Sequence, residues 1–336
     1  MTAIPLPLRQ NTPEWEAARQ SPDFIGASDV PIITGSSPYV HTSAYDLWAY
    51  KTGRLDRLPV DDSTQEIFDL GHALEPVIAS RYTAMTGRPL RRVNRTLAHR
   101  DVPWAVASLD RVSAVKGERL IVEIKWDPWS RFSRATEGIP PYVIEQVQWQ
   151  LMVTGYPLAE VAALLGSHVD RYEVAPDPDF QADLLFIVDQ FRRHHLLTDT
   201  PPPVDGSEAT RKAISRLYPN DNGELMEPTA ELRALMAELK DAIPAEKAAT
   251  EEVGRLKNAI RSALGEHSGA ETDEWRISFK KGKARRTTDW RALASHYRSM
   301  VEAPDEVLDE IESRHITEGE GARPLLPRWA KEEQWT

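Results

Sequence analysis

Glu123 and Lys125 stand two positions apart in the otherwise apolar run LIVEIKW, residues 120–126. Successive side chains of a β-strand point to opposite faces, so these two would project from the same face. On a solvated outer face they would form an ordinary ion pair. In a cleft, the carboxylate could bind a metal ion and the ammonium group could steady negative charge on a reacting phosphate. The surrounding sequence must decide between these two interpretations.

An aspartate in the preceding apolar segment can reach the same face. Segment 104–114 (WAVASLDRVSA) alternates in the same way and predicts one strand that carries Asp110. Residues 116–118 (KGE) have the composition of a hairpin turn, so the two strands should pair and bring Asp110 beside Glu123. An aspartate next to a Glu-x-Lys pair is the arrangement of PD-(D/E)xK nucleases. The two carboxylates would hold a divalent metal, and Lys125 would orient the attacking water and steady negative charge.

The composition is that of an ordinary globular protein and excludes several kinds of site. The chain has 336 residues, 41% hydrophobic and 28% charged, and no apolar run approaches the length of a membrane span. The absence of cysteine excludes disulfides, thiolate nucleophiles and cysteine-ligated zinc or iron–sulfur clusters. The N-terminus lacks the pattern of a secretory signal, so we expect a cytoplasmic protein. The net charge of −11 argues mildly against simple coating of nucleic acid, but it does not exclude a nuclease, whose catalytic carboxylates are themselves acidic.

Hydrophobic periodicity predicts further strands and helices around the proposed site. Strands are expected near 90–97, 161–166 and 169–174, and helices over 43–53, 67–87, 140–155 and 178–197. Pro76 leaves open whether the second of these helices kinks there or begins anew. In the third, Tyr142, Gln146 and Gln150 recur every four residues and therefore share one helix face. This order of elements predicts an α/β domain with a central mixed sheet flanked by helices.

Three consecutive prolines mark a boundary in the chain. The stretch DTPPPVDG, residues 199–206, cannot continue a helix. The expected division is an α/β nuclease domain over 1–200, a linker over 201–230 and a mostly helical C-terminal module over 231–336. In that module, 229–264 has helical spacing and predicts one exposed helix, two helices or a helical hairpin. Residues 274–290 have the pattern of a β-hairpin that turns at Gly282.

Four separated motifs resemble, in the same order, those of the lambda exonuclease/YqaJ-type viral recombinase family of the PD-(D/E)xK superfamily. They are IGASDVPIITGSSPY (25–39), GHALEPVIASRY (71–82), SLDR…VEIKW (108–126) and YVIEQVQWQLMVTG (142–155). The Q-x-Q-x-Q pattern in the last motif is the most specific of these features. The resemblance covers most of residues 15–200 and weakens beyond 200. It implies a restriction-endonuclease-like core, followed by a mostly helical C-terminal extension.

The resemblance also implies a role for each matching residue. These are Asp110, Glu123, Lys125, Gln146 and Glu75 for catalysis, Glu75, Asp110, Glu123 and Ile124 for the metal, and Ser28 and Arg19 for DNA phosphate. Ile124 would contribute its backbone carbonyl. Ser28 matches a family position near the terminal phosphate of DNA, and Arg19 follows Trp15 as in the family's W-x-x-x-R. The stretch between Arg19 and Ser28 is longer than usual in the family, which puts the role of Arg19 in doubt.

The activity that the resemblance implies is that of a Mg²⁺-dependent exodeoxyribonuclease, with Mn²⁺ as the other candidate metal. It would degrade double-stranded DNA from 5′ to 3′ in the bacterial host cytoplasm and leave single-stranded DNA for a phage-type annealing protein in recombination. A ring-like homo-oligomer around the DNA is also implied, and no membrane partner is expected. Two alternatives stay open. One is another PD-(D/E)xK nuclease, such as an endonuclease or junction resolvase, and the other is a catalytically silent DNA-binding scaffold.

Basic and aromatic residues provide candidate DNA contacts outside the motifs. Segments 88–94 (RPLRRVN) and 280–286 (KKGKARR) could contact phosphates or form solvated faces. Trp126 and Trp129 flank the proposed site and could stack on a base. Core packing explains Trp126 equally well.

Overall fold

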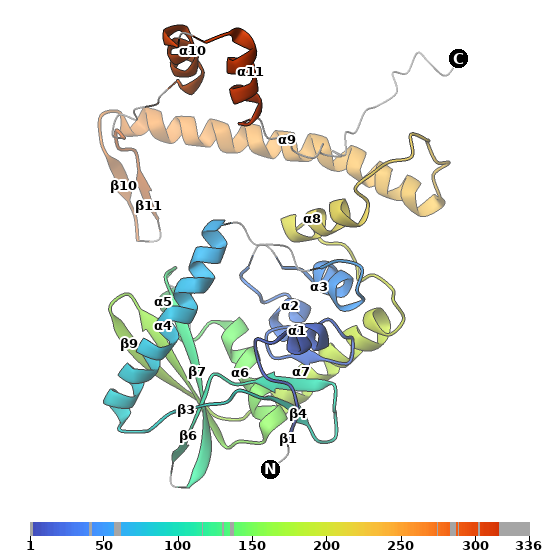
Figure 1. Cartoon of the computed structure of the whole chain (residues 1–336), viewed down its shortest axis with the longest axis vertical. Helices are drawn as coiled ribbons and strands as arrows, with labels where there is room; N and C mark the ends of the chain where they lie inside the picture. Colours follow the sequence, from blue (N-terminus) through green and yellow to red (C-terminus); the bar gives the residue numbers. More distant parts are fainter. Residues whose placement is uncertain are drawn as a thin grey trace. The chain divides into compact units, whose positions relative to one another are not determined.

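A mixed five-stranded sheet carries the proposed reactive strand (Figure 1). Its order is β3-β6-β7-β8-β9, with bounds Arg91–Arg92, Arg111–Val115, Glu118–Asp127, Leu158–Leu165 and His168–Val174. Strands β7 and β8 are parallel, and the other neighbouring pairs are antiparallel. The expected mixed sheet is confirmed, as is the antiparallel pairing of β6 with β7.

The structure, a computed structural model, describes most of the chain. The exceptions are residues 1–2, 40–41, 57–61, 116, 130, 135–137, 274, 283–286, 288, 302 and 316–336. The chain divides into two compact units, residues 1–220 and 221–336. Among the described residues, none of the helices has both the length and the apolar character needed to cross a bilayer.

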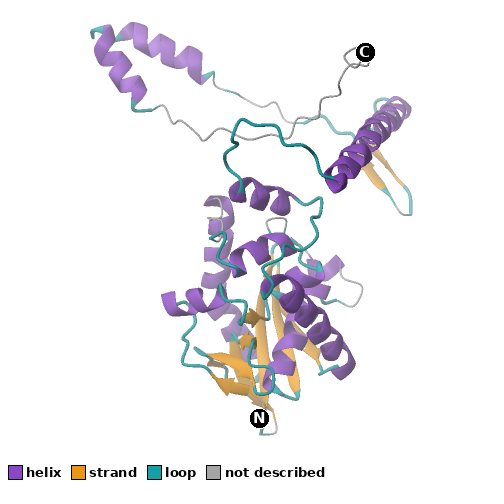
Figure 2. Ribbon diagram, turned by 90° about the vertical axis from the view of Figure 1, so that its right-hand side faces the viewer, coloured by secondary structure: helices purple, strands orange, loops and turns teal. Residues whose placement is uncertain are grey.

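Helices cover both faces of the five-stranded sheet (Figure 2). Helix α4 (Asp62–Thr86) packs on one face, where Ile78 lies against Val122 of β7. Helix α6 (Pro141–Thr154) packs on the other, with Val147 buried in the main core. The predicted α/β class, with a central mixed sheet flanked by helices, is therefore confirmed.

Helix α6 begins and ends as the sequence predicts. Pro141 occupies its first turn, where the missing N–H of proline costs no helical hydrogen bond. Gly155 ends it with a φ of 65°, a left-handed conformation that glycine adopts without a steric penalty. These limits fix which residues of α6 face the sheet.

A second sheet has the order β1-β4-β5-β2. Its strands are Ala3–Pro5, Thr96–His99, Ala105–Ser108 and Ile25–Gly26. The prediction of one strand over 104–114 is therefore wrong, because β5 belongs to this sheet and β6 to the other. Leu109 and Asp110 form the crossing between the sheets. Leu109 is buried in the core, and the Asp110 side chain accepts a hydrogen bond from the backbone N–H of Ile124 (2.9 Å).

Six further helices complete the first unit. They are α1 (Pro13–Arg19), α2 (Val30–Thr34), α3 (Ala44–Lys51), α5 (Arg131–Arg134), α7 (Pro178–Phe191), with a π-helical turn at Arg192–Leu196, and α8 (Glu208–Leu217). Helix α8 lies within 201–230, which the sequence suggested as a linker. Its Ala209 and Ala213 are buried, and the Thr210 hydroxyl donates a hydrogen bond to Ser43, the N-cap of α3 (2.9 Å). This part of the range therefore packs as part of the first unit.

The second unit is mostly helical, as expected. It contains α9 (Ala230–Leu264), β10 (Gly269–Glu271), β11 (Arg276–Ser278), α10 (Trp290–Met300) and α11 (Asp305–Ser313). Helix α9 is a single helix of 35 residues. Strand β10 pairs with β11, and the bond from Thr272 N–H to Trp275 O (2.7 Å) joins the residues between them. The predicted hairpin at Gly282 stays a prediction, because most of its returning segment lies outside the described residues. Of the basic segment 280–286, residues 283–286 lie outside the described residues.

Candidate active site

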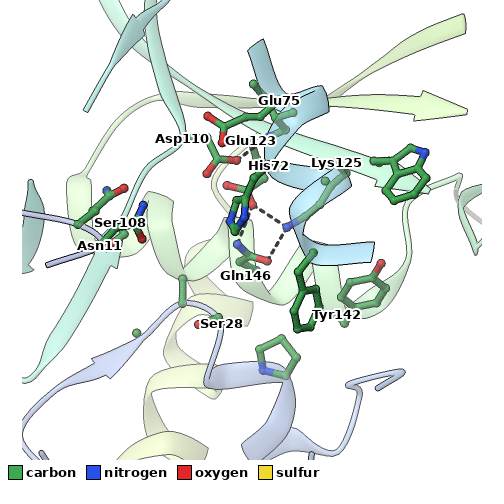
Figure 3. Close-up of a pocket in the computed structure, with 18 of the residues that line it drawn as sticks. Asn11, Ser28, His72, Glu75, Ser108, Asp110, Glu123, Lys125, Tyr142 and Gln146 are labelled. Carbon is green, nitrogen blue, oxygen red and sulfur yellow. Dashed lines mark hydrogen bonds and ion pairs between the residues drawn. The ribbon is translucent and has the colours of Figure 1, made fainter. Parts of the chain in front are cut away.

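A cleft of about 590 Å³ opens in the first unit and brings the predicted site residues together. Those that line it are Arg19, Ser28, Glu75, Asp110, Glu123, Ile124, Lys125 and Gln146. Figure 3 shows the acidic residues and Lys125 at one side of this cleft and Ser28 at the other. The strands β6 and β7 and the helices α4 and α6 therefore contribute to one shared site.

Glu123 is the centre of a hydrogen-bonded group, although its side chain is almost completely buried. Its Oε1 accepts hydrogen bonds from Lys125 Nζ and from Gln146 Nε2, both at 2.7 Å. Its Oε2 accepts one from Gln150 Nε2 (2.9 Å). Lys125 Nζ also donates to Gln146 Oε1 (2.9 Å), which closes a three-membered ring of contacts. The carboxylate and the ammonium group are thereby held at fixed positions beside the cleft.

Lys125 carries its positive charge at ordinary pH. Burial alone would lower its pKa, but the carboxylates of Glu123 and Asp110 outweigh burial and raise the pKa above its usual value. The side chain is therefore suited to orienting groups and stabilising negative charge. It is not suited to accepting a proton.

Asp110 lies in the crossing between β5 and β6 and points toward Glu123 (Figure 3). Burial and the nearby Glu123 carboxylate raise the pKa of Asp110 to about 7, although Lys125 acts in the opposite direction. The N–H of Ile124 donates to Asp110 Oδ2 and fixes the side chain. Buried Glu123 and half-buried Asp110 thus share one ammonium group, which leaves this corner of the cleft with surplus negative charge.

Glu75 reaches the cleft from α4, as the sequence predicts, but it already has a cationic partner. Its carboxylate forms an ion pair with Arg111, which also donates to the backbone carbonyl of Asp110 (2.7 Å). Arg111 therefore joins α4 to the chain crossing at Asp110. A role for Glu75 as a metal ligand stays a prediction.

Ser28 lies in the turn between β2 and α2, on the far wall of the cleft (Figure 3). The next residue, Asp29, is buried and forms an ion pair with buried Lys51 (2.8 Å). Lys51 also donates to the backbone carbonyls of Phe24 (2.5 Å) and Arg19 (2.7 Å). Burial raises the pKa of Asp29, but Lys51 and Arg19 outweigh burial and lower it. This network fixes the turn that carries Ser28.

Arg19 lines the same cleft, with its guanidinium over the ring of Trp15 at 4.5 Å. It also contacts Glu16 at 3.8 Å. Its predicted role in phosphate binding, like that of Ser28, stays a prediction.

Comparison with known proteins identifies this region. Residues 14–157 match the family model described as a YqaJ-like viral recombinase domain. We call residues 14–157 the YqaJ-like domain after this match. The resemblance seen in the four sequence motifs is confirmed. The match spans all of the predicted residues that line the cleft.

The chain is also similar to individual proteins, one known by sequence and two by solved structures. The uncharacterized protein YqaJ of Bacillus subtilis (strain 168) is 29% identical over 222 residues, covering 65% of this chain and 67% of that protein. The alkaline exonuclease LHK-Exo from Laribacter hongkongensis is 22% identical with a TM-score of 0.44, over 56% of this chain and 94% of its own. A phage related exonuclease from Haemophilus somnus 129PT is 11% identical with a TM-score of 0.39, over 53% and 95% respectively.

The sequence did not single out two residues of the YqaJ-like domain that contribute to the cleft region. Gln150 donates to Glu123, and among the described residues its buried Oε1 has no hydrogen-bond partner. Its spacing of four from Gln146 was the available indication. His72 lines the cleft one helical turn before Glu75 on α4. Gln148, the middle glutamine of the motif, faces away and bonds the backbone of Ala175 (2.8 Å).

The donor set at this site is a pair of neighbouring carboxylates, Asp110 and Glu123, which suits a divalent cation that keeps bound waters. In the part of the chain that the structure describes, no three or more His, Cys, Asp or Glu side chains are arranged to hold a metal. Mg²⁺, however, is commonly bound by one or two carboxylates together with waters. Asp110 and Glu123 provide two carboxylates. Burial and then repulsion from Glu123 raise the pKa of Asp110, and a divalent cation would offset that repulsion.

Proposed function

We propose that the YqaJ-like domain is a metal-dependent exonuclease that hydrolyses phosphodiester bonds of double-stranded DNA from an end. The convergence of Asp110, Glu123, Lys125 and Gln146 in one cleft carries this proposal. Buried carboxylates with surplus negative charge suit a divalent cation, and a charged lysine beside them suits a phosphate. The family match to a viral recombinase domain supports DNA as the substrate.

Each residue has a distinct role in the proposed reaction. Asp110 and Glu123 would hold Mg²⁺ or Mn²⁺, with Glu75 and the Ile124 carbonyl as further ligands. The bound cation would supply an activated water and neutralise phosphate charge. Lys125 orients the attacking water and stabilises charge on the phosphate.

The step is a simple hydrolysis. The water oxygen bonds to phosphorus while the P–O3′ bond breaks, and the leaving O3′ takes a proton. Gln146 keeps the reactive groups in place, because it contacts both Lys125 and Glu123.

The direction and biological role of the reaction are the finer part of the proposal. We propose 5′→3′ degradation, with Ser28 and Arg19 on the far wall near the terminal phosphate. Such resection would leave single-stranded DNA for an annealing protein. We propose that the protein acts as a ring-like homo-oligomer around the duplex. The support is the family match and the position of Ser28 in a turn fixed by the Asp29–Lys51 pair.

The test uses a linear duplex with a 5′-phosphate on one strand only, with Mg²⁺, with Mn²⁺ or with EDTA. We expect metal-dependent shortening of the phosphorylated strand and no cutting of closed circular DNA. Lys125→Ala should abolish cleavage while leaving metal-dependent DNA binding intact. Cutting of the closed circle would favour an endonuclease. Binding of DNA by the wild type without any cleavage would favour the scaffold alternative.

We also propose that residues 221–336 are dispensable for the chemical step. The site lies wholly within the first unit, and α8 packs there through Ala209, Thr210 and Ala213. A chain ending at Asn220 should fold and cleave, whereas one ending at Gly206 should unfold more easily because it lacks α8. Thermal unfolding and nuclease assays on both truncations check this. Equal stability of the two would contradict the assignment of α8 to the nuclease domain.

A further inference from the structure

Aromatic rings and a guanidinium group gather at one side of the cleft, and the proposed chemistry does not use them. The guanidinium carbon of Arg131 lies 4.3 Å from the ring centre of Trp129 and 5.3 Å from that of Tyr39. Tyr39 in turn meets Tyr142 edge to face, with ring centres 6.0 Å apart. We call Tyr39, Trp129, Arg131 and Tyr142 the aromatic platform.

The platform lies next to the reactive residues. Tyr142, Tyr39 and Trp129 all line the same cleft as Lys125. Tyr142 is one helical turn before Gln146 on α6, and Figure 3 shows it beside Lys125. Trp129 follows Lys125 by four residues, just beyond the end of β7. A nucleotide whose phosphate met Lys125 would therefore have its base within reach of these rings.

Two rings of the platform are exposed, and the backbone at Trp129 is held by a buried carboxylate. Trp129 and Tyr39 expose 41% and 36% of their surface. Buried Asp127 accepts hydrogen bonds from the N–H groups of Trp129 (3.2 Å) and Phe132 (2.9 Å). Phe132 is itself buried. The ring of Trp129 is thus presented to solvent from a backbone position that Asp127 holds.

We infer that the aromatic platform stacks an unpaired nucleobase of the DNA strand end beside the cleavage site. This rests on the proposed function. A base inside a duplex has both faces covered by its neighbours, so stacking on the platform requires an unstacked end. Base–aromatic stacking tolerates any sequence, and an arginine contributes a cation–π contact and attraction to phosphate. A platform of this composition suits DNA better than a protein partner, because it is cationic and continuous with the proposed phosphate site.

The experiment places 2-aminopurine, a base whose fluorescence is quenched by stacking, as an unpaired nucleotide overhanging the end of a duplex. Full-length protein is added with Ca²⁺ in place of Mg²⁺, so that binding is observed apart from cleavage. We expect strong quenching with the wild type and with Trp129→Phe, which keeps a ring. Most of the quenching that the protein causes should be lost in Trp129→Ala and in Arg131→Ala. With the wild type, a probe placed ten base pairs inside the duplex should change little in fluorescence when protein is added. Trp275→Ala removes an exposed tryptophan of the second unit and is the matched control.

A kinetic measurement separates stacking from a structural effect. In Mg²⁺, Trp129→Ala should raise KM roughly ten-fold, within the range expected for the loss of one stacked base, and leave kcat nearly unchanged. A fall in kcat that Trp129→Phe does not restore would indicate a distorted site and overturn the inference.

The failure of the inference and that of the proposed function give different results. Cleavage by the wild type with equal quenching in Trp129→Ala would overturn the platform alone. Quenching that depends on Trp129, without cleavage in any metal, would overturn the nuclease proposal and leave base binding standing.

Discussion

Two buried glutamates lie on neighbouring strands and point to opposite faces of the same sheet. In the register of β7 and β8, Val122 pairs with Glu160 and Glu123 pairs with Val161. Glu160 meets Tyr82 of α4, whereas Glu123 meets the glutamines of α6. Both side chains are almost completely buried. Only Glu123 faces the cleft.

The difference between them is the balance of charge. Glu160 accepts hydrogen bonds from Tyr82 OH (2.6 Å), Arg88 Nη1 (2.5 Å) and Arg171 Nη1 (2.8 Å), so two cations surround one carboxylate. Glu123 has one cation, Lys125, which it shares with Asp110. A carboxylate whose negative charge is neutralised by neighbouring arginines serves to join helices and strands. A pair of carboxylates with a single lysine between them keeps negative charge that a metal cation can bind. Burial alone therefore does not distinguish a structural from a functional glutamate.

The largest expected effect is on activity, at Glu123. Glu123→Gln should reduce hydrolysis by roughly 10³-fold, or about 4 kcal/mol, because it removes a proposed metal ligand and a partner of Lys125. The free energy of unfolding should stay the same or rise, because the change relieves repulsion with Asp110. Nuclease assays and urea unfolding on the same preparation check both parts. A strongly destabilised but active variant would reverse the comparison.

Glu160 should show the opposite behaviour. Glu160→Ala should lower the free energy of unfolding by about 3–5 kcal/mol, because Arg88, Arg171 and Tyr82 lose their common partner. Activity per folded molecule should be retained, because no proposed reactive group contacts Glu160. Denaturant unfolding measures the first quantity, and activity corrected for the folded fraction measures the second. Loss of activity in a fully folded variant would show that the α4 face takes part in the reaction.

The hydrogen bond between Tyr82 and Glu160 makes stability sensitive to alkaline pH. Burial, followed by the bond to Glu160, raises the pKa of Tyr82 from 10.0 to about 12. The stabilisation is therefore fully present below pH 10 and is lost as pH rises toward 12, by about 1–2 kcal/mol. Tyr82→Phe should be less stable at pH 8 but should lose less stability between pH 10 and 12. If the free energy of unfolding fell equally in Tyr82→Phe and wild type between pH 10 and 12, the assignment of this pH dependence to Tyr82 would be contradicted.

The sequence alone correctly predicted strand β7, which carries Glu123, and helix α6, which packs beside it. Alternation placed Leu120 and Val122 on one face and Glu123 on the other, and the structure has Val122 packing toward α4. Spacings of four placed Gln146 and Gln150 on one face of α6, and both contact Glu123. These predictions succeed because they depend on local geometry, with periods of 2 and 3.6 residues.

Contacts between distant residues could not be predicted in the same way. The period of a strand shows which face a side chain takes but not which sheet the strand joins, so the crossing at Asp110 was missed. The Asp29–Lys51 pair and the Glu75–Arg111 pair connect residues that only the folded chain brings together. Glu160 directly precedes the apolar run 161–166 that predicted a strand, and its arginine partners come from other segments.

The smallest expected effect is at a third glutamate, Glu252, on exposed helix α9. Its carboxylate pairs with Arg255 at 2.6 Å, and both side chains are more than half exposed. Glu252→Ala should change the free energy of unfolding by less than about 0.5 kcal/mol, because solvent and salt screen such pairs. Paired with Glu160→Ala in the same urea experiment, it isolates burial as the variable, since each glutamate contacts arginine at a similar distance. If Glu252→Ala lowered the free energy of unfolding as much as Glu160→Ala does, the second unit would have to hold the Glu252–Arg255 pair away from water.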